Sequence, residues 1–298
     1  MRVAVVLNPE AHAGRAGQAQ ATLEAALPSR GVDAAVRRTE GAGHAAAIVQ
    51  SLPDDFDAVV SAGGDGTLFE VVNGLMARPA ERRPPLAILP MGTGNAFARD
   101  LGLEPGAVDA ALDALVAGHT RLVDVAEVRH PGGGFHYLNI LGVGFVTRAA
   151  RAATALKGLG RGAYTLGALA ALLRIPSLPL ELELDGARLP VQESFFVEVA
   201  NSRYTGTRFL MAPDARIDDG LLDVVLVGRL PRRRALRLFP AIYDGRHVAA
   251  REVSVFQART VRLCAPVGLE CLVDGEFRGR TPLEITCRPG QLRMFAVR

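Results

Sequence analysis

The chain has 298 residues, of which 49% are hydrophobic and 22% charged, so its composition is that of a folded protein and excludes a disordered one. A formal net charge of +3 is too small to indicate nucleic-acid binding, and we expect no nucleic-acid partner. Cys264, Cys271 and Cys287 lack metal-ligand spacing and fit reduced thiols in a cytoplasmic protein. The longest apolar run, 163–173, is well short of the roughly 20 residues that a membrane span needs, so a soluble protein is expected.

From Met1 to about Arg121, apolar strands alternate with amphipathic helices. We expect strands at 3–7, 34–38, 58–62 and 86–89, and helices at 18–27, 44–51, 68–76, 96–101 and 108–117. This alternation predicts a Rossmann-like α/β domain with a parallel sheet covered by helices. Ligands of such domains bind at the carboxyl ends of the strands, where the glycine-rich turns of this chain fall.

After Leu122 the pattern changes to short strands divided by Gly, Pro and Asp turns. We expect strands at 123–128, 135–140, 180–184, 195–200, 222–227, 253–256, 261–264, 269–273 and 292–297, and helices around 149–173 and 232–243. The pattern predicts a β-sandwich. The expected domains are therefore an α/β domain over 1–122 and a β-sandwich domain over 123–289.

A glycine-rich turn, Gly63-Gly64-Asp65-Gly66-Thr67, lies between the apolar strand 58–62 and the helix 68–76. Glycines at such a turn let backbone N–H groups converge on an anion, and the N-terminus of the helix adds a partial positive charge. Asp65 is a carboxylate inside this anion cradle. An acid beside phosphate-binding amides makes chemical sense when a divalent cation lies between them. The turn therefore predicts metal-assisted binding of nucleotide phosphates.

A second turn, Gly92-Thr93-Gly94-Asn95, also follows an apolar strand and opens a helix, and we expect it to line the same crevice. Asn8-Pro9 and Thr39 follow the first two strands and should reach the same edge of the sheet. Asn8 and Thr39 are equally compatible with turn formation and helix capping.

Two acidic turns lie in the second part of the chain. Asp218-Asp219-Gly220-Leu221-Leu222-Asp223 surrounds a glycine with carboxylates, which fits either a solvated turn or a site for a hard cation. Asp274-Gly275-Glu276 follows an apolar strand, and Asp-Gly is a common hairpin signal. Its functional interpretation is a general base that deprotonates an alcohol.

Taken in this order, the motifs resemble those of the diacylglycerol kinase catalytic-domain family, which includes sphingosine, ceramide and bacterial lipid kinases. The resemblance runs from Asn8-Pro9 through the two glycine turns to the turns at 218–223 and 273–276. It implies transfer of the γ-phosphoryl group of ATP to the hydroxyl of a membrane-derived lipid, with Mg²⁺, in a cleft between the two domains. It also implies that the end of the chain, about 290–298, returns to the first domain.

The resemblance also implies roles for individual residues. The residues that would bind ATP are Asn8, Pro9, Thr39, Gly63, Gly64, Asp65, Gly66, Thr67, Leu68, Phe69, Glu70, Gly92, Thr93, Gly94 and Asn95. Asp65 would organise a catalytic Mg²⁺ through water, and Asp219 with the carbonyls of Arg216 and Leu221 would bind a structural Mg²⁺. Asp274 and Glu276 would supply the catalytic base and a metal contact. The sequence does not decide which of the two removes the proton of the lipid hydroxyl.

Two positions depart from the family pattern. Many bacterial relatives have Asp where this chain has Ala96, and the glycine that usually follows Asn-Pro closely is delayed here to Gly14. Two alternatives stay open: an NAD kinase, because NAD kinases share the first glycine turn, and a catalytically silent lipid- or nucleotide-binding regulator, which Ala96 suggests.

The segment 231–239 combines four arginines with leucines and a phenylalanine, which fits peripheral contact with an anionic membrane or an ordinary surface helix. We expect a cytoplasmic enzyme that can bind peripherally to the inner face of the membrane. A homodimer is compatible with the sequence, which does not fix the oligomeric state or the lipid.

Overall fold

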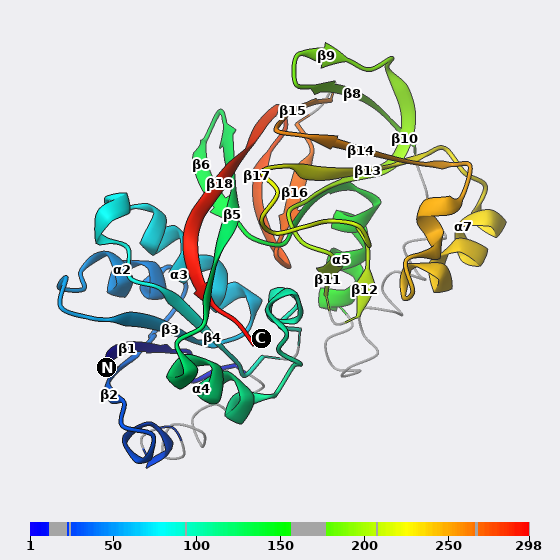
Figure 1. Ribbon diagram of the computed structural model, residues 1–298. Helices are drawn as coiled ribbons and strands as arrows, with labels where there is room; N and C mark the ends of the chain where they lie inside the picture. The colour runs from blue at the N-terminus through cyan, green and yellow to red at the C-terminus, as the bar shows by residue number, and fades with distance from the viewer. Residues whose placement is uncertain are drawn as a thin grey trace. The chain divides into compact units, whose positions relative to one another are not determined.

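The structure is a computed structural model that describes residues 1–11, 23, 25–92, 94–155, 177–206, 208–265 and 268–297. The chain forms two compact units (Figure 1). Unit 1 contains Met1–Val125 together with Pro289–Arg298, and unit 2 contains Ala126–Arg288. None of the helices in the described ranges combines the length and the apolar character that crossing a membrane requires.

Unit 1 is built on a parallel sheet. Its elements are β1 (Arg2–Leu7), β2 (Asp33–Arg38), α2 (His44–Gln50), β3 (Ala58–Gly63), α3 (Asp65–Met76), η1 (Ala80–Arg82), β4 (Leu86–Pro90), η2 (Phe97–Leu101), α4 (Val108–Ala117), the start of β5 (Thr120–His130) and the end of β18 (Leu283–Phe295). The strand order is β2-β1-β3-β4-β18, with parallel neighbours throughout. Figure 1 shows α2 and α3 on one side of these strands and α4 on the other.

The register of this sheet aligns the ends of its strands. Leu7 of β1 pairs with Arg38 of β2 and with Ala62 of β3, and Gly63 pairs with Pro90 of β4. The residues that follow these four strands therefore emerge along one edge. This edge is the carboxyl end of a parallel sheet, where ligands of α/β proteins bind.

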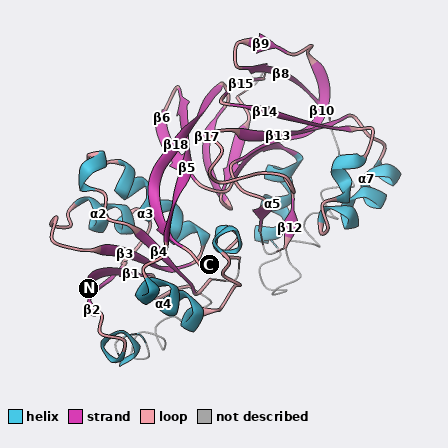
Figure 2. Cartoon of the chain, viewed as in Figure 1, coloured by secondary structure: helices cyan, strands magenta, loops and turns pink. Residues whose placement is uncertain are grey.

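Unit 2 is β-rich (Figure 2). Its remaining elements are β6 (Gly133–Tyr137), β7 (Ile140–Gly144), α5 (Phe145–Ala155), β8 (Leu178–Leu184), β9 (Ala187–Arg188), β10 (Gln192–Ala200), β11 (Tyr204–Thr205), β12 (Phe209–Leu210), β13 (Leu222–Gly228), α7 (Arg232–Leu238), η4 (Phe239–Ile242), η5 (Arg246–Ala249), β14 (Val253–Ala258), β15 (Thr260–Cys264), β16 (Glu270–Val273) and β17 (Glu276–Arg280).

The strands of unit 2 form two antiparallel sheets that share β10. One has the order β17-β16-β7-β10-β13-β14, and in the other β15 pairs with β8 and β18. Residues 192–194 of β10 also pair with β8, so this strand belongs to both sheets. The phenol of Tyr137, which is fully buried, donates a hydrogen bond to the carbonyl of Val199 in β10. This hydrogen bond ties β6, which pairs with β5, to β10.

Several predicted elements differ from the structure. The strand expected at 135–140 is two strands, β6 and β7, and the strand expected at 292–297 begins much earlier, at Leu283. The predicted helix 96–101 is the 3₁₀-helix η2, and the strand β17 was not predicted. The helices expected at 18–27 and 149–173 lie largely outside the described residues.

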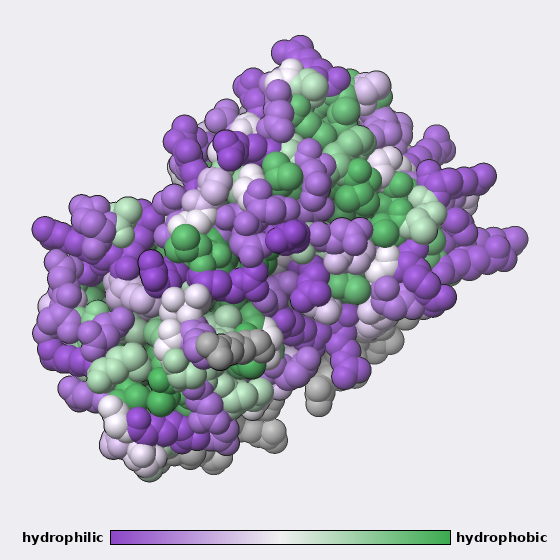
Figure 3. All heavy atoms as spheres, in the orientation of Figure 1, coloured by the Kyte–Doolittle hydropathy of each residue, from purple (hydrophilic) through white to green (hydrophobic). Residues whose placement is uncertain are grey.

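On the face drawn in Figure 3, hydrophilic residues cover most of the surface, and the apolar residues form patches separated by polar ones.

Candidate functional site

The first glycine turn joins the buried strand β3 to the helix α3. All six residues of β3 are buried, whereas Gly64, Asp65 and Gly66 are half-buried and reachable from outside. A Cβ atom on Gly63 would lie 2.5 Å from Oγ1 of Thr67, so a larger residue does not fit there. The turn thereby brings the N-terminus of α3 to the carboxyl edge of the sheet, where the partial positive charge of the helix favours an anion.

The second glycine turn packs directly against the first. A Cβ atom on Gly92 would lie 2.4 Å from the Cα atom of Gly64, so the two backbones touch at a point where side chains cannot be accommodated. The N–H of Met91 donates to the carbonyl of Gly63 at 3.0 Å. The predicted proximity of the two turns is therefore present in the structure.

Two side chains fasten the turns together. The Nδ2 atom of Asn95 donates to the carbonyl of Gly63 at 3.0 Å, and Oδ1 of Asp65 accepts the N–H of Ala96 at 2.9 Å. Asn95 is 3% exposed and has a φ of 48°, a left-handed conformation that asparagine tolerates. Its Oδ1 has no hydrogen-bond partner among the described residues. Asp65 thus meets the second turn through the backbone of Ala96.

Asn8 and Thr39 lie at the same edge. Nδ2 of Asn8 donates to Oγ1 of Thr67 at 3.0 Å, and its Oδ1 accepts the N–H of Glu10 at 3.0 Å, which forms an Asx turn. The N–H of Thr39 donates to the carbonyl of Leu7 at 2.9 Å. Turn formation, one of the two interpretations of Asn8, is therefore present, and Asn8 also contacts the first glycine turn.

Glu70 has a defined contact within unit 1. Its carboxylate accepts the N–H groups of Gly43, at 2.6 Å, and Ala45, at 3.1 Å. Gly43 has a φ of 82° and is the N-cap of α2. Glu70 therefore supplies from α3 the anion that the start of α2 favours, and it fixes the two helices to each other.

The other predicted nucleotide-binding residues have simpler positions. Pro9 and Gly94 are half-buried beside the turns, Leu68 and Phe69 are buried on α3, and Thr93 lies outside the described residues.

In unit 2, the acidic turn at 218–223 gathers negative charge. Oδ1 of Asp219 accepts the N–H of Leu221 at 3.0 Å, and Asp223 is 3% exposed at the start of β13. Burial and the charges of Asp219 and Asp214 raise the pKa of Asp223 to about 6, and its Oδ2 has no hydrogen-bond partner within the described residues.

Within the described part of the chain, no group of three or more His, Cys, Asp or Glu side chains is arranged to hold a metal ion. A cation at the acidic turn would therefore need backbone carbonyls, as the predicted set of Asp219 with Arg216 and Leu221 provides.

The Asp274-Gly275 pair forms the predicted hairpin turn between β16 and β17. Asp274 and Gly275 have φ values of 49° and 88°, and Val273 pairs with Glu276 across the turn. Oδ1 of Asp274 accepts the N–H of Ile140 at 3.2 Å, which ties the hairpin to β7. Glu276 accepts a hydrogen bond from Arg278 at 2.5 Å. Both carboxylates are half-buried, so their role as a base stays a prediction.

The sequence matches two family models that together span both units. Residues 2–128 match the diacylglycerol kinase catalytic domain, and residues 139–296 match the YegS C-terminal NAD kinase beta sandwich-like domain. A diacylglycerol kinase of Mycobacterium tuberculosis is 34% identical over 100% of this chain and 96% of its own length. The chain belongs to the diacylglycerol kinase family. The predicted family is thereby confirmed, and the chain is an enzyme of the lipid kinase class.

Other known proteins are also similar to this member of the diacylglycerol kinase family. A diacylglycerol kinase of Bacillus subtilis is 31% identical over 77% of this chain and 74% of its own length. A crystal structure of a diacylglycerol kinase from Bacillus anthracis has a TM-score of 0.72 at 25% identity and covers 99% of this chain and 97% of that one. An NAD kinase from Archaeoglobus fulgidus, in complex with ATP, has a TM-score of 0.54 at 15% identity, covering 99% of this chain and 93% of that one. These neighbours confirm the predicted fold class; the cleft between the domains stays a prediction.

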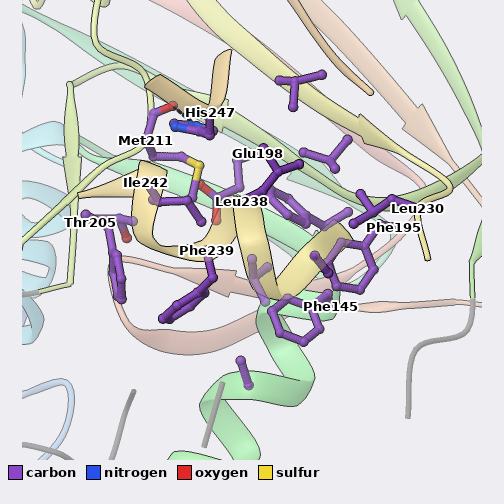
Figure 4. A pocket seen from close by; sticks show the side chains of 17 residues that line it. Phe145, Phe195, Glu198, Thr205, Met211, Leu230, Leu238, Phe239, Ile242 and His247 are labelled. Atoms are coloured by element: carbon purple, nitrogen blue, oxygen red, sulfur yellow. Dashed lines mark hydrogen bonds between the residues drawn. The ribbon is translucent and has the colours of Figure 1, made fainter. Parts of the chain in front are cut away.

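Unit 2 of the kinase contains an apolar pocket that sequence reasoning missed (Figure 4). The space between its walls, including the part open to solvent, is about 690 Å³. The register of β10 shifts between Ser194 and Phe196, and this bulge lets Phe195 and Phe196 both face the pocket. Phe145 of α5 stacks on Phe195 at 4.4 Å between ring centroids.

The helical segment 232–242 supplies the other wall of this pocket. Ala235 and Leu238 of α7 and Phe239 and Ile242 of η4 line it. This segment thus covers the apolar pocket from one side and carries arginines at its exposed positions 232, 233 and 237. The signal in the sequence was the pair Phe195-Phe196, which alone is indistinguishable from ordinary core.

Proposed function

We propose that the chain transfers the γ-phosphoryl group of ATP to the hydroxyl of a membrane lipid such as diacylglycerol, with Mg²⁺. The observation that carries this proposal is the contact between the two glycine turns at the N-terminus of α3. There, Gly64 and Gly92 meet without side chains between them, at a helix N-terminus whose partial positive charge favours an anion. The apolar pocket of unit 2 favours a lipid acceptor over the polar dinucleotide that an NAD kinase would take.

The residues fit the groups that the family uses. Backbone N–H groups of the first turn of α3 would bind phosphate oxygens, and Asp65 would orient the phosphate-bound cation. Asp219, with the carbonyls of Arg216 and Leu221, would hold a structural Mg²⁺, because carboxylate and carbonyl oxygens are the ligands of hard cations. Oδ2 of Asp223 is buried and has no hydrogen-bond partner among the described residues, which supports a cation nearby. When bound, Mg²⁺ neutralises charge on the transferred phosphoryl group.

Asp274 and Glu276 would provide the carboxylate that accepts the proton of the lipid hydroxyl. The backbone N–H of Ile140 holds Asp274 in place, and Arg278 holds Glu276. A carboxylate fixed in this way keeps one orientation for proton transfer.

Contact with an anionic membrane is part of the proposal. Arg232, Arg233 and Arg237 of α7 are exposed, and Leu236 beside them is 46% exposed. Arg234 differs, because its guanidinium pairs with Glu252 at 3.0 Å. Three arginines around an exposed leucine suit a surface that meets anionic head groups.

Labelled ATP tests the proposal when it is incubated in turn with diacylglycerol, ceramide, sphingosine and NAD. We expect label in a lipid product and a loss of turnover on the order of a hundredfold or more in Asp65→Ala. Asp33→Ala, at an exposed carboxylate of the same unit, is the matched control and should keep activity. Label in NAD would contradict the lipid acceptor, and full activity of Asp65→Ala would remove Asp65 from the chemistry. No turnover with any acceptor would support the silent regulator.

A further inference from the structure

The apolar pocket of unit 2 contains one carboxyl group that the proposed chemistry does not use. Glu198 lies in the middle of β10, where it pairs with Gly142 of β7 on one side and Val225 of β13 on the other. It is 4% exposed and lines the pocket (Figure 4). A Cβ atom on Gly142 would lie 3.3 Å from Cγ of Glu198 and 2.5 Å from Val146, so the glycine leaves room for the acid.

Glu198 has unused hydrogen-bonding capacity. Its Oε2 is buried without a hydrogen-bond partner within the described residues. Burial alone raises the pKa of Glu198 to about 8, so at neutral pH the side chain is mostly a protonated acid with an O–H to donate. His247 is the other ionisable side chain among the described lining residues: its Nε2 lies 3.1 Å from the carbonyl of Met211, and its Nδ1 is buried without a hydrogen-bond partner among those residues.

An unsatisfied donor in an apolar pocket favours a ligand that brings an acceptor. A hydrocarbon chain would leave the O–H without a partner, which is unfavourable. A carbonyl oxygen of an acyl ester accepts the hydrogen bond and remains compatible with the apolar walls. A protonated amine would require a buried ion pair, whose desolvation penalty offsets the attraction.

We propose that Glu198 binds an acyl-ester carbonyl of the lipid as a hydrogen-bond donor, and so makes this kinase select ester-linked diacylglycerols over lipids without that carbonyl. This inference rests on the proposed function, because it names the feature of the acceptor lipid that the pocket recognises. Glu198 is then a specificity-determining residue and takes no part in phosphoryl transfer.

The test compares dioctanoylglycerol with the dialkyl ether glycerol of the same chain length. The wild type should show a roughly three- to tenfold higher kcat/KM for the ester, the range of one hydrogen bond, and the difference should lie in KM. Glu198→Gln keeps an N–H donor and should keep this ratio within about twofold, whereas Glu198→Leu should bring it to about one. Glu193→Gln, on an exposed position of the same strand, is the matched control and should keep the wild-type ratio.

Three results would overturn the role of Glu198: an equal ratio in the wild type and Glu198→Leu, loss of the ratio in Glu198→Gln, or a preference for sphingosine. Binding of the two labelled lipids without ATP separates this inference from the proposed function. If the protein binds the ester more tightly than the ether and Glu198→Leu loses this preference, the role of Glu198 is supported even when no lipid is phosphorylated. The absence of lipid phosphorylation would refute only the proposed function.

Discussion

Replacing Glu198 with Gln should stabilise the protein, increasingly so as the pH rises. In the unfolded chain the carboxyl loses its proton near its ordinary pKa of 4.5, whereas burial in the folded protein raises the pKa to about 8. Between these values only the unfolded state releases the proton, so folding stability is lost as the pH rises from 4.5 to 8 and levels off above. Glutamine has no proton to lose and avoids this cost.

The magnitude follows from the difference between pH 7 and 4.5, which is 2.5 units. At about 1.4 kcal/mol per unit, the variant should be more stable than the wild type by about 3 kcal/mol at pH 7. At pH 5 the difference should fall below about 1 kcal/mol.

Urea unfolding followed by circular dichroism at pH 5 and pH 7 measures both values; the chain has no tryptophan to report by fluorescence. Glu193→Gln, at an exposed position of the same strand, should change stability little at either pH. If the free energies of unfolding of Glu198→Gln and wild type differ by the same amount at pH 5 and pH 7, the conclusion that Glu198 is buried as a neutral acid is refuted.

The remaining predictions concern the glycine turns, Glu70 and α7. Gly92→Ala should lower kcat/KM for ATP at least about tenfold and cost about 1–3 kcal/mol of stability, because its Cβ would lie 2.4 Å from the backbone of the first turn. Glu70→Gln should lower the free energy of unfolding by about 1–2 kcal/mol in urea titrations, since it weakens two charge-assisted hydrogen bonds to α2. Changing Arg232, Arg233 and Arg237 together to glutamine should reduce binding to anionic vesicles roughly a hundredfold in a sedimentation assay.

Each of these predictions has an outcome that would contradict it, and two of them have a control. Gly41→Ala is the control for Gly92→Ala, because no atom lies within 4 Å of a Cβ added at Gly41. Normal ATP kinetics in both variants would contradict the close contact of the two glycine turns. An unchanged urea titration of Glu70→Gln would show that its carboxylate adds nothing at α2. Vesicles of neutral lipid should bind the triple arginine variant as they bind wild type, and equal binding to anionic vesicles would exclude α7 as the contact.

Much of unit 1 could be predicted from the sequence because its signals are local. Buried strands such as 58–62 are apolar except for Ser61, and the glycines at 63, 64 and 66 mark the end of one strand and the start of a helix. Parallel pairing then places the residues after each strand at one edge, which is why the two glycine turns could be expected together.

The parts that were missed depend on contacts distant in sequence. β18 runs through Pro289-Gly290, which locally indicates a break, but the N–H of Gly290 donates to Asp124 at 2.8 Å and the strand continues. The pocket depends on a bulge in β10 that turns two neighbouring phenylalanines to one side, and alternation alone places them on opposite faces. The sequence did not single out Glu198, because its surroundings come from β7 and β13, which are distant in the chain.

The direct backbone contact between Gly64 and Gly92 makes the two positions interdependent in evolution and in engineering. A Cβ atom on Gly92 would require the first loop to withdraw, whereas a Cβ atom on Gly64 would lie 3.4 Å from the Cα atom of Gly92, which is an ordinary contact. A single-site library at position 92 should therefore return glycine almost alone. Changes in nucleotide preference are to be sought at neighbouring side chains, and position 92 could vary only together with a remodelled loop.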